Sequence, residues 1–252
     1  DGLIKFPEYT FKKNGKGLVI NLTSIHNIIS TNKAALSKVL EAPCLCGYYI
    51  GERAITTDEN VICFNDINLV KENILVSPET MELLTLNTQE KIKYFHTGRQ
   101  LLFETDDVIV HGYEHEGMDM YPIKELNDYL EVEFPSMCKL PKLLLQSVID
   151  RLSLFIEPYD KNGAYFKFTS EGVEVSSKRS KSIEVISYSE SRDFSPFICC
   201  VDIPMLKSQV DSNPGELIEL HYGHPAAIKL VSGNVTQVIA LLEDDSLESV
   251  NE

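Results

Sequence analysis

The chain has 252 residues, which allows one large domain or two domains of about the commonest size. Apolar residues make up 43% of it and charged residues 24%, a composition typical of a folded protein and unlike that of a disordered one. Acidic residues outnumber basic ones by 38 to 23, so the net charge of −15 argues against a surface that is basic throughout and binds nucleic acid. A basic strip on one face stays compatible with that total, because charge can be distributed unevenly.

The sequence also bears on location and on metal chemistry. It lacks an apolar run of the roughly 20 residues that a membrane helix needs, and it lacks a signal segment, so we expect an intracellular protein. Most of the six cysteines lie in apolar, strand-like runs, which favours buried reduced thiols. A zinc site is disfavoured because a single residue separates Cys44 from Cys46 and no second pair follows.

Catalytic motifs find little support. The six histidines are scattered, and His111 and His115 lack the glutamate and the helix of a metal-binding pair. The sequence has no Gly-rich phosphate loop and no G-x-S-x-G nucleophile motif. We therefore expect no enzyme activity, no metal and no cofactor.

The first half of the chain predicts strands and two helices in a fixed order. Residues 9–22 alternate around an Asn-Gly pair, which is typical of a hairpin. Apolar residues at helical spacing predict a helix over residues 23–40, and three short alternating runs within residues 44–67 predict an antiparallel meander.

A shorter helix is predicted to begin at the Ser-Pro-Glu sequence of residues 77–79 and to end near Asn87. Serine can cap the free amides, proline suits the first helical position and glutamate suits the positive helix end. Three strands are predicted within residues 92–113. Residues 114–135 are weakly patterned, and we interpret them as a connector.

The second half repeats this order. An amphipathic helix is predicted from about residue 141, followed by three strands within residues 164–188. Residues 202–204 then open a second short helix, and three strands end at Leu242. Residues 243–252 are acidic and are predicted to form a mobile tail.

The stretches from Ile74 and Ile198 thus share one pattern: a strand, a short helix opened by proline, a polar turn and three strands. This repeat predicts an α+β fold of two duplicated clamp-type domains, residues 1–134 and 135–252. Each domain is expected to place antiparallel sheets on the outside and two helices on one inner face, with four helix-plus-three-strand units in all.

The pattern resembles that of DNA sliding clamps, and the bacterial β clamp most closely. The segments PKLLLQSVIDRLSLF, AYFKFTSEGVEVSS and ICCVDIPMLKSQVDSNPGELIELHYG look like the last domain of a β clamp. In the first half, ERAITTDENVICF lies where that family has Ala-Thr-Asp-Gly-His-Arg-Leu, with Glu-Asn-Val at residues 59–61 in place of Gly-His-Arg.

The resemblance implies a function and a set of partners. It implies a non-catalytic ring that encircles double-stranded DNA without reading its sequence and tethers a DNA polymerase, with a clamp loader as a further partner. Bacterial clamps have three such domains per chain and close as dimers. Two domains per chain favour a homotrimer over a dimer, and suggest a phage clamp or a piece of a longer clamp, in the cytoplasm of a bacterium or of a phage-infected host.

Two candidate sites follow. Helix faces that line the hole should carry scattered bases for phosphate contacts, and the candidates are Lys33 and Lys38 in the first helix, Lys139, Lys142 and Arg151 in the third, and Lys207 in the fourth. The alternative is an ordinary solvated helix face, which the nearby residues Glu41, Glu79, Glu82 and Asp150 favour.

The second site is a peptide pocket for partner proteins, which the resemblance places at Thr57, Ile62, Pro135, Ala240, Leu241 and Leu242. For Leu241 and Leu242 the alternative is core packing of one of them, because neighbouring strand residues face opposite ways. The competing function is that of a clamp-fold adaptor that binds replication proteins without encircling DNA. The acidic total and the substituted residues 59–61 motivate it.

Overall fold

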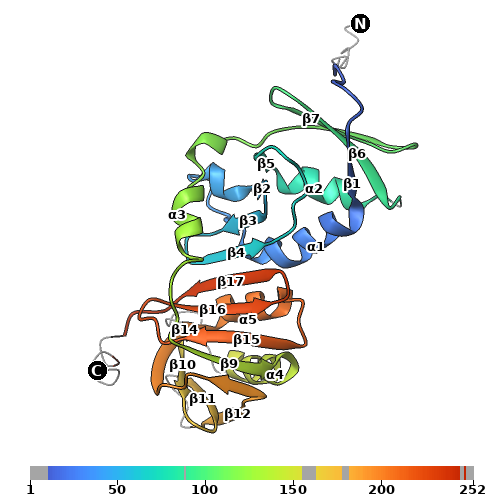
Figure 1. The fold of residues 1–252 in the computed structure, drawn as a ribbon. Helices are drawn as coiled ribbons and strands as arrows, with labels where there is room; N and C mark the ends of the chain where they lie inside the picture. The colour runs from blue at the N-terminus through green and yellow to red at the C-terminus, as the bar shows by residue number, and fades with distance from the viewer. Residues whose placement is uncertain (1–10, 88, 155–162, 178–181, 245–246, 248–252) are drawn as a thin grey trace, which may run out of the picture.

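The computed structural model describes residues 11–87, 89–154, 163–177, 182–244 and 247. Its elements form four copies of one unit, a strand followed by a helix and three strands (Figure 1). The first copy contains β1 (Leu18–Asn21), α1 (Leu22–Asn32), β2 (Tyr48–Ile50), β3 (Ala54–Thr57) and β4 (Val61–Asn65). The second contains β5 (Ile74–Val76), α2 (Pro78–Thr85), β6 (Lys91–Thr97), β7 (Gln100–Glu104) and β8 (Ile109–Tyr113).

The second half of the chain supplies the other two copies. The third contains β9 (Ser136–Pro141), α4 (Lys142–Ser153), β10 (Gly163–Phe168), β11 (Gly172–Ser177) and β12 (Glu184–Ser187). The fourth contains β14 (Phe197–Asp202), α5 (Ile203–Ser212), β15 (Leu217–Tyr222), β16 (Ala227–Ser232) and β17 (Val235–Ala240). Outside these units lie the short helices η1 (Lys33–Ala35), η2 (Pro43–Cys46), η3 (Met118–Met120) and α3 (Ile123–Asp128), and the strand β13 (Glu190–Arg192).

The two units of each half exchange their first strands. Strand β1 joins the sheet β6-β7-β8, and β14 joins β12-β11-β10. Strands β5 and β9 are exchanged in the same way, but β4 also pairs with β17, so their two sheets fuse into one of nine strands, β13-β9-β15-β16-β17-β4-β3-β2-β5. Every strand pair in the described chain is antiparallel, which confirms the predicted α+β fold.

Four helices contact one another in the order α2, α1, α5, α4 and so form one continuous helical surface (Figure 1). Local caps start three of them. Asn21, Ser77 and Asp202 each accept a hydrogen bond from a backbone amide of the first turn of α1, α2 and α5. The predicted Ser-Pro-Glu opening of α2 is confirmed.

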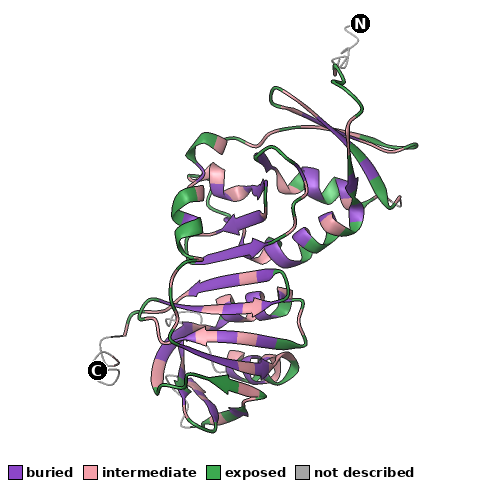
Figure 2. Ribbon diagram, viewed as in Figure 1, coloured by how far each residue is buried: buried purple, intermediate pink, exposed green. Residues whose placement is uncertain are grey.

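Buried residues follow the strands and the inner sides of the helices (Figure 2). One apolar cluster lies in each half, beneath α1 and α2 and beneath α4 and α5. A third cluster joins the outer face of the nine-stranded sheet to the connector, where Tyr121 and Leu126 pack with Ile62 and Val238. The connector is therefore a packed element that covers the junction of the two halves.

A buried polar network joins the halves on the helical side. Asn65 on β4 donates to the Thr31 hydroxyl over 2.8 Å and accepts from Asn234 over 2.7 Å. Gln209 on α5 donates to the carbonyl oxygen of Ala34 over 3.1 Å, and Gln237 on β17 donates in turn to the Gln209 carbonyl oxygen. Because buried polar groups need partners, this network favours one arrangement of the two halves.

Several local predictions were wrong. The hairpin predicted over residues 9–22 is absent from its described part, because β1 pairs with β6 instead. The first helix ends at Asn32, whose side-chain amide donates to the Cys63 carbonyl oxygen over 3.0 Å and turns the chain toward the core. Strand β13 lies in a stretch for which no strand was predicted. The predicted boundary between residues 134 and 135 falls in the link from α3 to β9 and stays a prediction.

Candidate functional site

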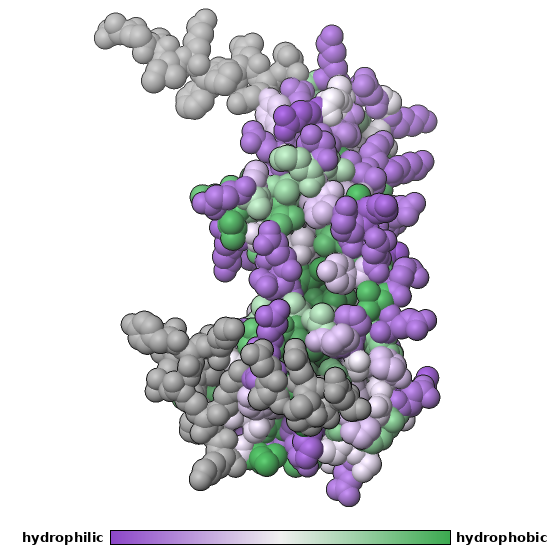
Figure 3. Space-filling model, turned by 90° about the vertical axis from the view of Figure 1, so that its left-hand side faces the viewer, coloured by the Kyte–Doolittle hydropathy of each residue, from purple (hydrophilic) through white to green (hydrophobic). Residues whose placement is uncertain are grey.

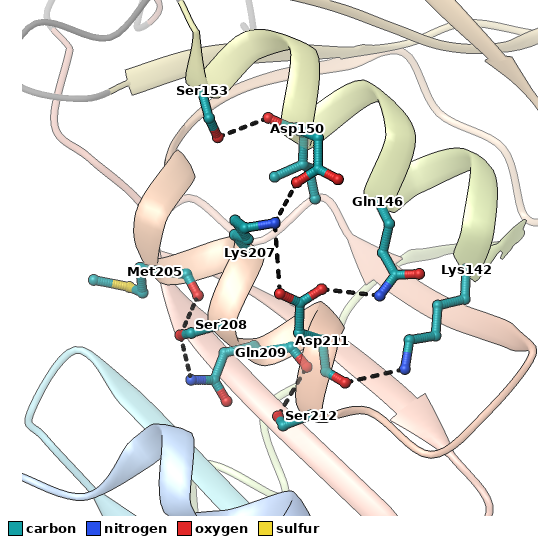
Figure 4. A network of polar contacts seen from close by, with 11 residues as sticks. Lys142, Gln146, Asp150, Ser153, Met205, Lys207, Ser208, Gln209, Asp211 and Ser212 are labelled. Carbon is teal, nitrogen blue, oxygen red and sulfur yellow. Dashed lines mark hydrogen bonds and ion pairs between the residues drawn. The ribbon is translucent and has the colours of Figure 1, made fainter.

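The helical surface carries charged side chains that are held by neighbours on the same surface (Figure 4). Lys207 on α5 pairs with Asp150 on α4 and lies 3.6 Å from the Asp211 carboxylate. Asp211 in turn accepts a 2.9 Å hydrogen bond from Gln146. The hydrogen bond with Asp150 raises the pKa of Lys207, so this amine stays charged while an acid offsets its charge.

Lys142 has a structural partner of another kind. Its amine donates to the carbonyl oxygens of Asp211 and Asn213, over 3.1 and 2.5 Å, at the end of α5 (Figure 4). These groups lie at the negative end of the helix dipole, where a cation is favourable. Lys142 therefore joins α4 to the end of α5.

Two further bases pair with acids from distant segments. Arg151 on α4 makes a two-pronged contact with Glu184 on β12, which raises the pKa of Arg151 and lowers that of Glu184. Lys33 lies in η1 and pairs with Glu82 on α2 over 2.6 Å. Both pairs are largely exposed, so solvent screens them.

The structure corrects the placement of two predicted bases. Lys139 lies on β9, between Cys138 and Leu140, which belong to the core cluster beneath α4 and α5. Because strand residues alternate, Lys139 faces away from those helices, where it pairs with Glu190 and Glu219. Lys38 follows η1 instead of lying in a helix, and it is exposed and makes no ion pair with any described residue.

The helical surface as a whole is close to neutral. Helices α1, α2, α4 and α5 contain three bases, Lys142, Arg151 and Lys207, against four acids, Glu79, Glu82, Asp150 and Asp211, a net charge of −1. Exposed leucines also lie on α2 and α4, and Leu143 on α4 is 79% exposed. Attraction to phosphate would therefore be weak on this surface.

A pocket of about 760 Å³ lies beside β14. Figure 3 views the face with the connector and the C-terminal segment, and apolar side chains gather midway along it. The pocket is lined by Pro135, residues 195–200, Gly223, Pro225, residues 241–244 and Leu247. Gly223 has a φ of +97° and lies so close to Pro135 that a Cβ atom would come within 2.6 Å of the proline ring, so only glycine fits there.

The pocket brings together some of the predicted peptide-binding residues. Pro135, Leu241 and Leu242 line it. Thr57 and Ile62 do not, because they pair across β3 and β4 and are 2% and 6% exposed, with Ile62 packed beneath the connector. Ala240 is also outside the lining, and its amide donates to the Asn60 carbonyl oxygen over 2.8 Å.

Sequence reasoning missed most of the lining, including Phe197, Ile198 and Pro225. The Ser-Pro-Phe sequence at residues 195–197 and the His-Pro turn at residues 224–225 carry no signal beyond that of ordinary loops. They join the pocket only because β14 and the β15–β16 turn meet the end of the chain.

Metal and thiol chemistry add nothing to these two sites. The described residues contain no group of three or more metal-ligating side chains. All six cysteines are free, and burial raises the pKa of the Cys138 thiol to about 12 and also raises that of Cys199. Among the helices in the described ranges, none is long and apolar enough to cross a membrane.

Solved structures match this arrangement over nearly its whole length. The DNA polymerase sliding clamp from Bacillus subtilis superposes with a TM-score of 0.83 over 95% of this chain and 67% of its own, at 15% sequence identity. The beta subunit from the DNA polymerase of Streptococcus pyogenes gives 0.85 over 95% and 69%, also at 15% identity. The chain has the sliding-clamp fold.

The Caulobacter crescentus beta sliding clamp is similar to the same degree, with a TM-score of 0.81 over 95% of this chain and 68% of its own at 15% identity. The chain thus spans about two thirds of the length of these clamps. No protein-family model matches the sequence, and no curated protein matches it. The clamp fold is therefore evident from the structure, at a sequence identity that shows fold and not activity.

Proposed function

We propose that this protein is a DNA sliding clamp, a homo-oligomeric ring that encircles double-stranded DNA and tethers a DNA polymerase, with no chemistry of its own. The observation that carries the proposal is the way in which the two halves of one chain are joined. Strand β4, the third strand of the first unit's meander, pairs with β17, the corresponding strand of the fourth unit. The same kind of junction between chains would extend the row of units.

The strands for such a junction lie at opposite ends of the molecule. Strand β8 is an edge of the upper sheet and β12 an edge of the lower sheet (Figure 1). They correspond to β4 and β17 in the other two units. Apolar side chains are exposed on or beside both: Ile109 is 61% exposed and Tyr113 49% on β8, and Val185 is 60% exposed on β12. Exposed apolar edges need a partner to avoid aggregation.

Pairing β8 of one chain with β12 of the next is a head-to-tail contact, which closes into a ring when the rotation between copies permits. Three copies would give a ring of six clamp-type domains, which is the reason for favouring a trimer over a dimer. The helical surfaces of the copies would then line one hole. In this proposal the ring works in the cytoplasm of a bacterium or a phage-infected host, with a clamp loader as a further partner.

Retention on closed DNA tests the proposal. The assembled protein, loaded on nicked circular duplex, is expected to stay bound in about 0.5 M salt, because the link is topological and phosphate attraction is screened. It is expected to leave the same DNA within minutes of linearisation, by sliding off the ends. Equal loss from circular and linear DNA would reject encirclement.

An adaptor function is the second candidate, favoured by the net charge of −1 of the four helices. An adaptor of this fold would bind replication proteins without holding DNA. A protein that assembles into an oligomer, binds a polymerase and is never retained on circular DNA would support it. Retention on the circle would exclude it.

Removing acids that hold the lining bases should strengthen DNA binding. Glu82→Gln frees Lys33, and Asp150→Asn and Asp211→Asn free Lys207 from its two partners. We expect the triple variant to bind duplex DNA about tenfold or more tightly at low salt, with a steeper salt dependence. Fluorescence anisotropy with a short linear duplex measures both. The matched control is Glu174→Gln, which frees Lys167 on β10 and β11 away from the helices. Unchanged affinity in the triple variant would exclude this surface as the DNA-facing one.

A further inference from the structure

The pocket beside β14 already holds part of the chain itself. After β17 the backbone leaves the nine-stranded sheet, and the Leu242 amide donates a 2.9 Å hydrogen bond to the Cys200 carbonyl oxygen of β14. Two residues later, the Asp244 carboxylate accepts a 2.8 Å hydrogen bond from the Tyr165 hydroxyl on β10. The end of the chain, predicted to be a mobile tail, is therefore bound to another sheet over these described residues.

A turn then directs a leucine into the same region. The Leu247 amide donates to the Asp244 carbonyl oxygen over 2.9 Å, three residues back, which closes the turn. Leu247 lines the pocket together with Phe197 and Ile198. It also lines a smaller neighbouring cavity of about 270 Å³, together with Tyr165 and Ile183. One leucine side chain thus lies between two adjacent hollows.

The charges of the pocket come from this segment alone. The charged lining residues are Glu243 and Asp244, and the other described residues of the lining are apolar or uncharged. The site that receives the segment is consequently an apolar surface with the Tyr165 hydroxyl at its side. Such a surface suits a short peptide that supplies its own carboxylate and an apolar side chain.

We propose that this pocket is a peptide dock that the C-terminal segment of the same chain occupies, and that its ligands carry a carboxylate followed three residues later by leucine. A partner peptide binds by displacing the segment. The inference rests on the proposed function in one respect, namely that this dock is the one by which partners are tethered. A segment attached to the same chain competes at a local concentration of about the millimolar range, so it weakens every peptide that binds there.

The test uses a chain that ends at Leu242 and, as the probe, a labelled synthetic peptide of residues 243–252. We expect saturable binding of the peptide to the shortened chain by fluorescence anisotropy, and binding about tenfold or more weaker to the full-length chain. The matched control peptide carries Leu247→Asp, which removes a buried apolar side chain and should bind about tenfold or more weakly. Tyr165→Phe in the shortened chain should weaken the unchanged peptide about fivefold or more, because it removes a hydrogen bond to a carboxylate.

A second variant guards against misfolding of the shortened chain. Full-length protein with Leu247→Asp keeps every other residue, and it should bind the unchanged peptide as the shortened chain does. The proposal is overturned if both peptides bind equally, or if neither the shortened chain nor the full-length variant binds the unchanged peptide at protein concentrations of about 1 mM. These measurements involve no DNA and no polymerase, so they can fail while the ring stands, and succeed if the ring does not form.

Discussion

Replacing Val185 by aspartate is expected to convert the oligomer into monomers. In the proposed ring, this 60% exposed side chain on β12 packs against β8 of the next copy. The substitution removes an apolar contact and places a carboxylate at the junction, next to an edge that already follows Asp106 and Asp107. The combined loss is about 3 kcal/mol or more per junction, or about 100-fold in affinity.

Light scattering after size exclusion measures the result, which should be a 28.4 kDa species in place of a multiple of that mass. Ile109→Asp on β8 should have the same effect, because it changes the other side of the same junction. Leu217→Asp is the matched control: Leu217 is 49% exposed but lies on β15, inside the nine-stranded sheet. If Leu217→Asp dissociated the oligomer and Val185→Asp did not, the subunits would be joined elsewhere.

Replacing Gln237 by alanine is expected to destabilise the junction between the two halves of the chain. The fully buried Gln237 amide donates to the Gln209 carbonyl oxygen and the Ser212 hydroxyl over 3.1 and 3.0 Å, and it accepts from Asn213 over 3.0 Å. Alanine would leave these groups buried without their partner and would also leave a cavity. The free energy of unfolding should fall by about 2 to 4 kcal/mol.

Urea denaturation followed by circular dichroism measures this change as a shift of the midpoint at constant slope. Thr236→Ala is the matched control, since it changes the preceding residue of the same strand, which faces the other side of the sheet and is only partly buried. Its loss should be below about 1 kcal/mol. Similar losses in the two variants would mean that the polar network contributes little to stability.

The predictions that held depend on neighbours in sequence. The openings of α2 and α5 were predictable because Ser77 and Asp202 cap the amides of the turn that follows them. The end of α1 was not, because Asn32 leaves the helix to bond with Cys63, 31 residues further on. The tail was misjudged for the same reason, since the hydroxyl that receives Asp244 belongs to Tyr165, 79 residues away.

The candidate sites show the same division. That Lys33, Arg151 and Lys207 lie on the helical surface or at its edge follows from their places in the repeated unit. That each is paired with an acid does not, because Glu82, Glu184 and Asp150 lie 49, 33 and 57 residues away in the sequence. In the pocket, Pro135, Leu241 and Leu242 come from the two ends of the second half, and only the fold places them together.

The amino-acid sequence by itself determined the repeated unit, the antiparallel strands and the number of units, because periodicity, caps and turns act over a few residues. The tertiary structure alone decided how the units join, which charges are offset and what fills the pocket. Those features depend on contacts between segments tens of residues apart, whose closeness is set by the packing of whole sheets and helices and by no local pattern.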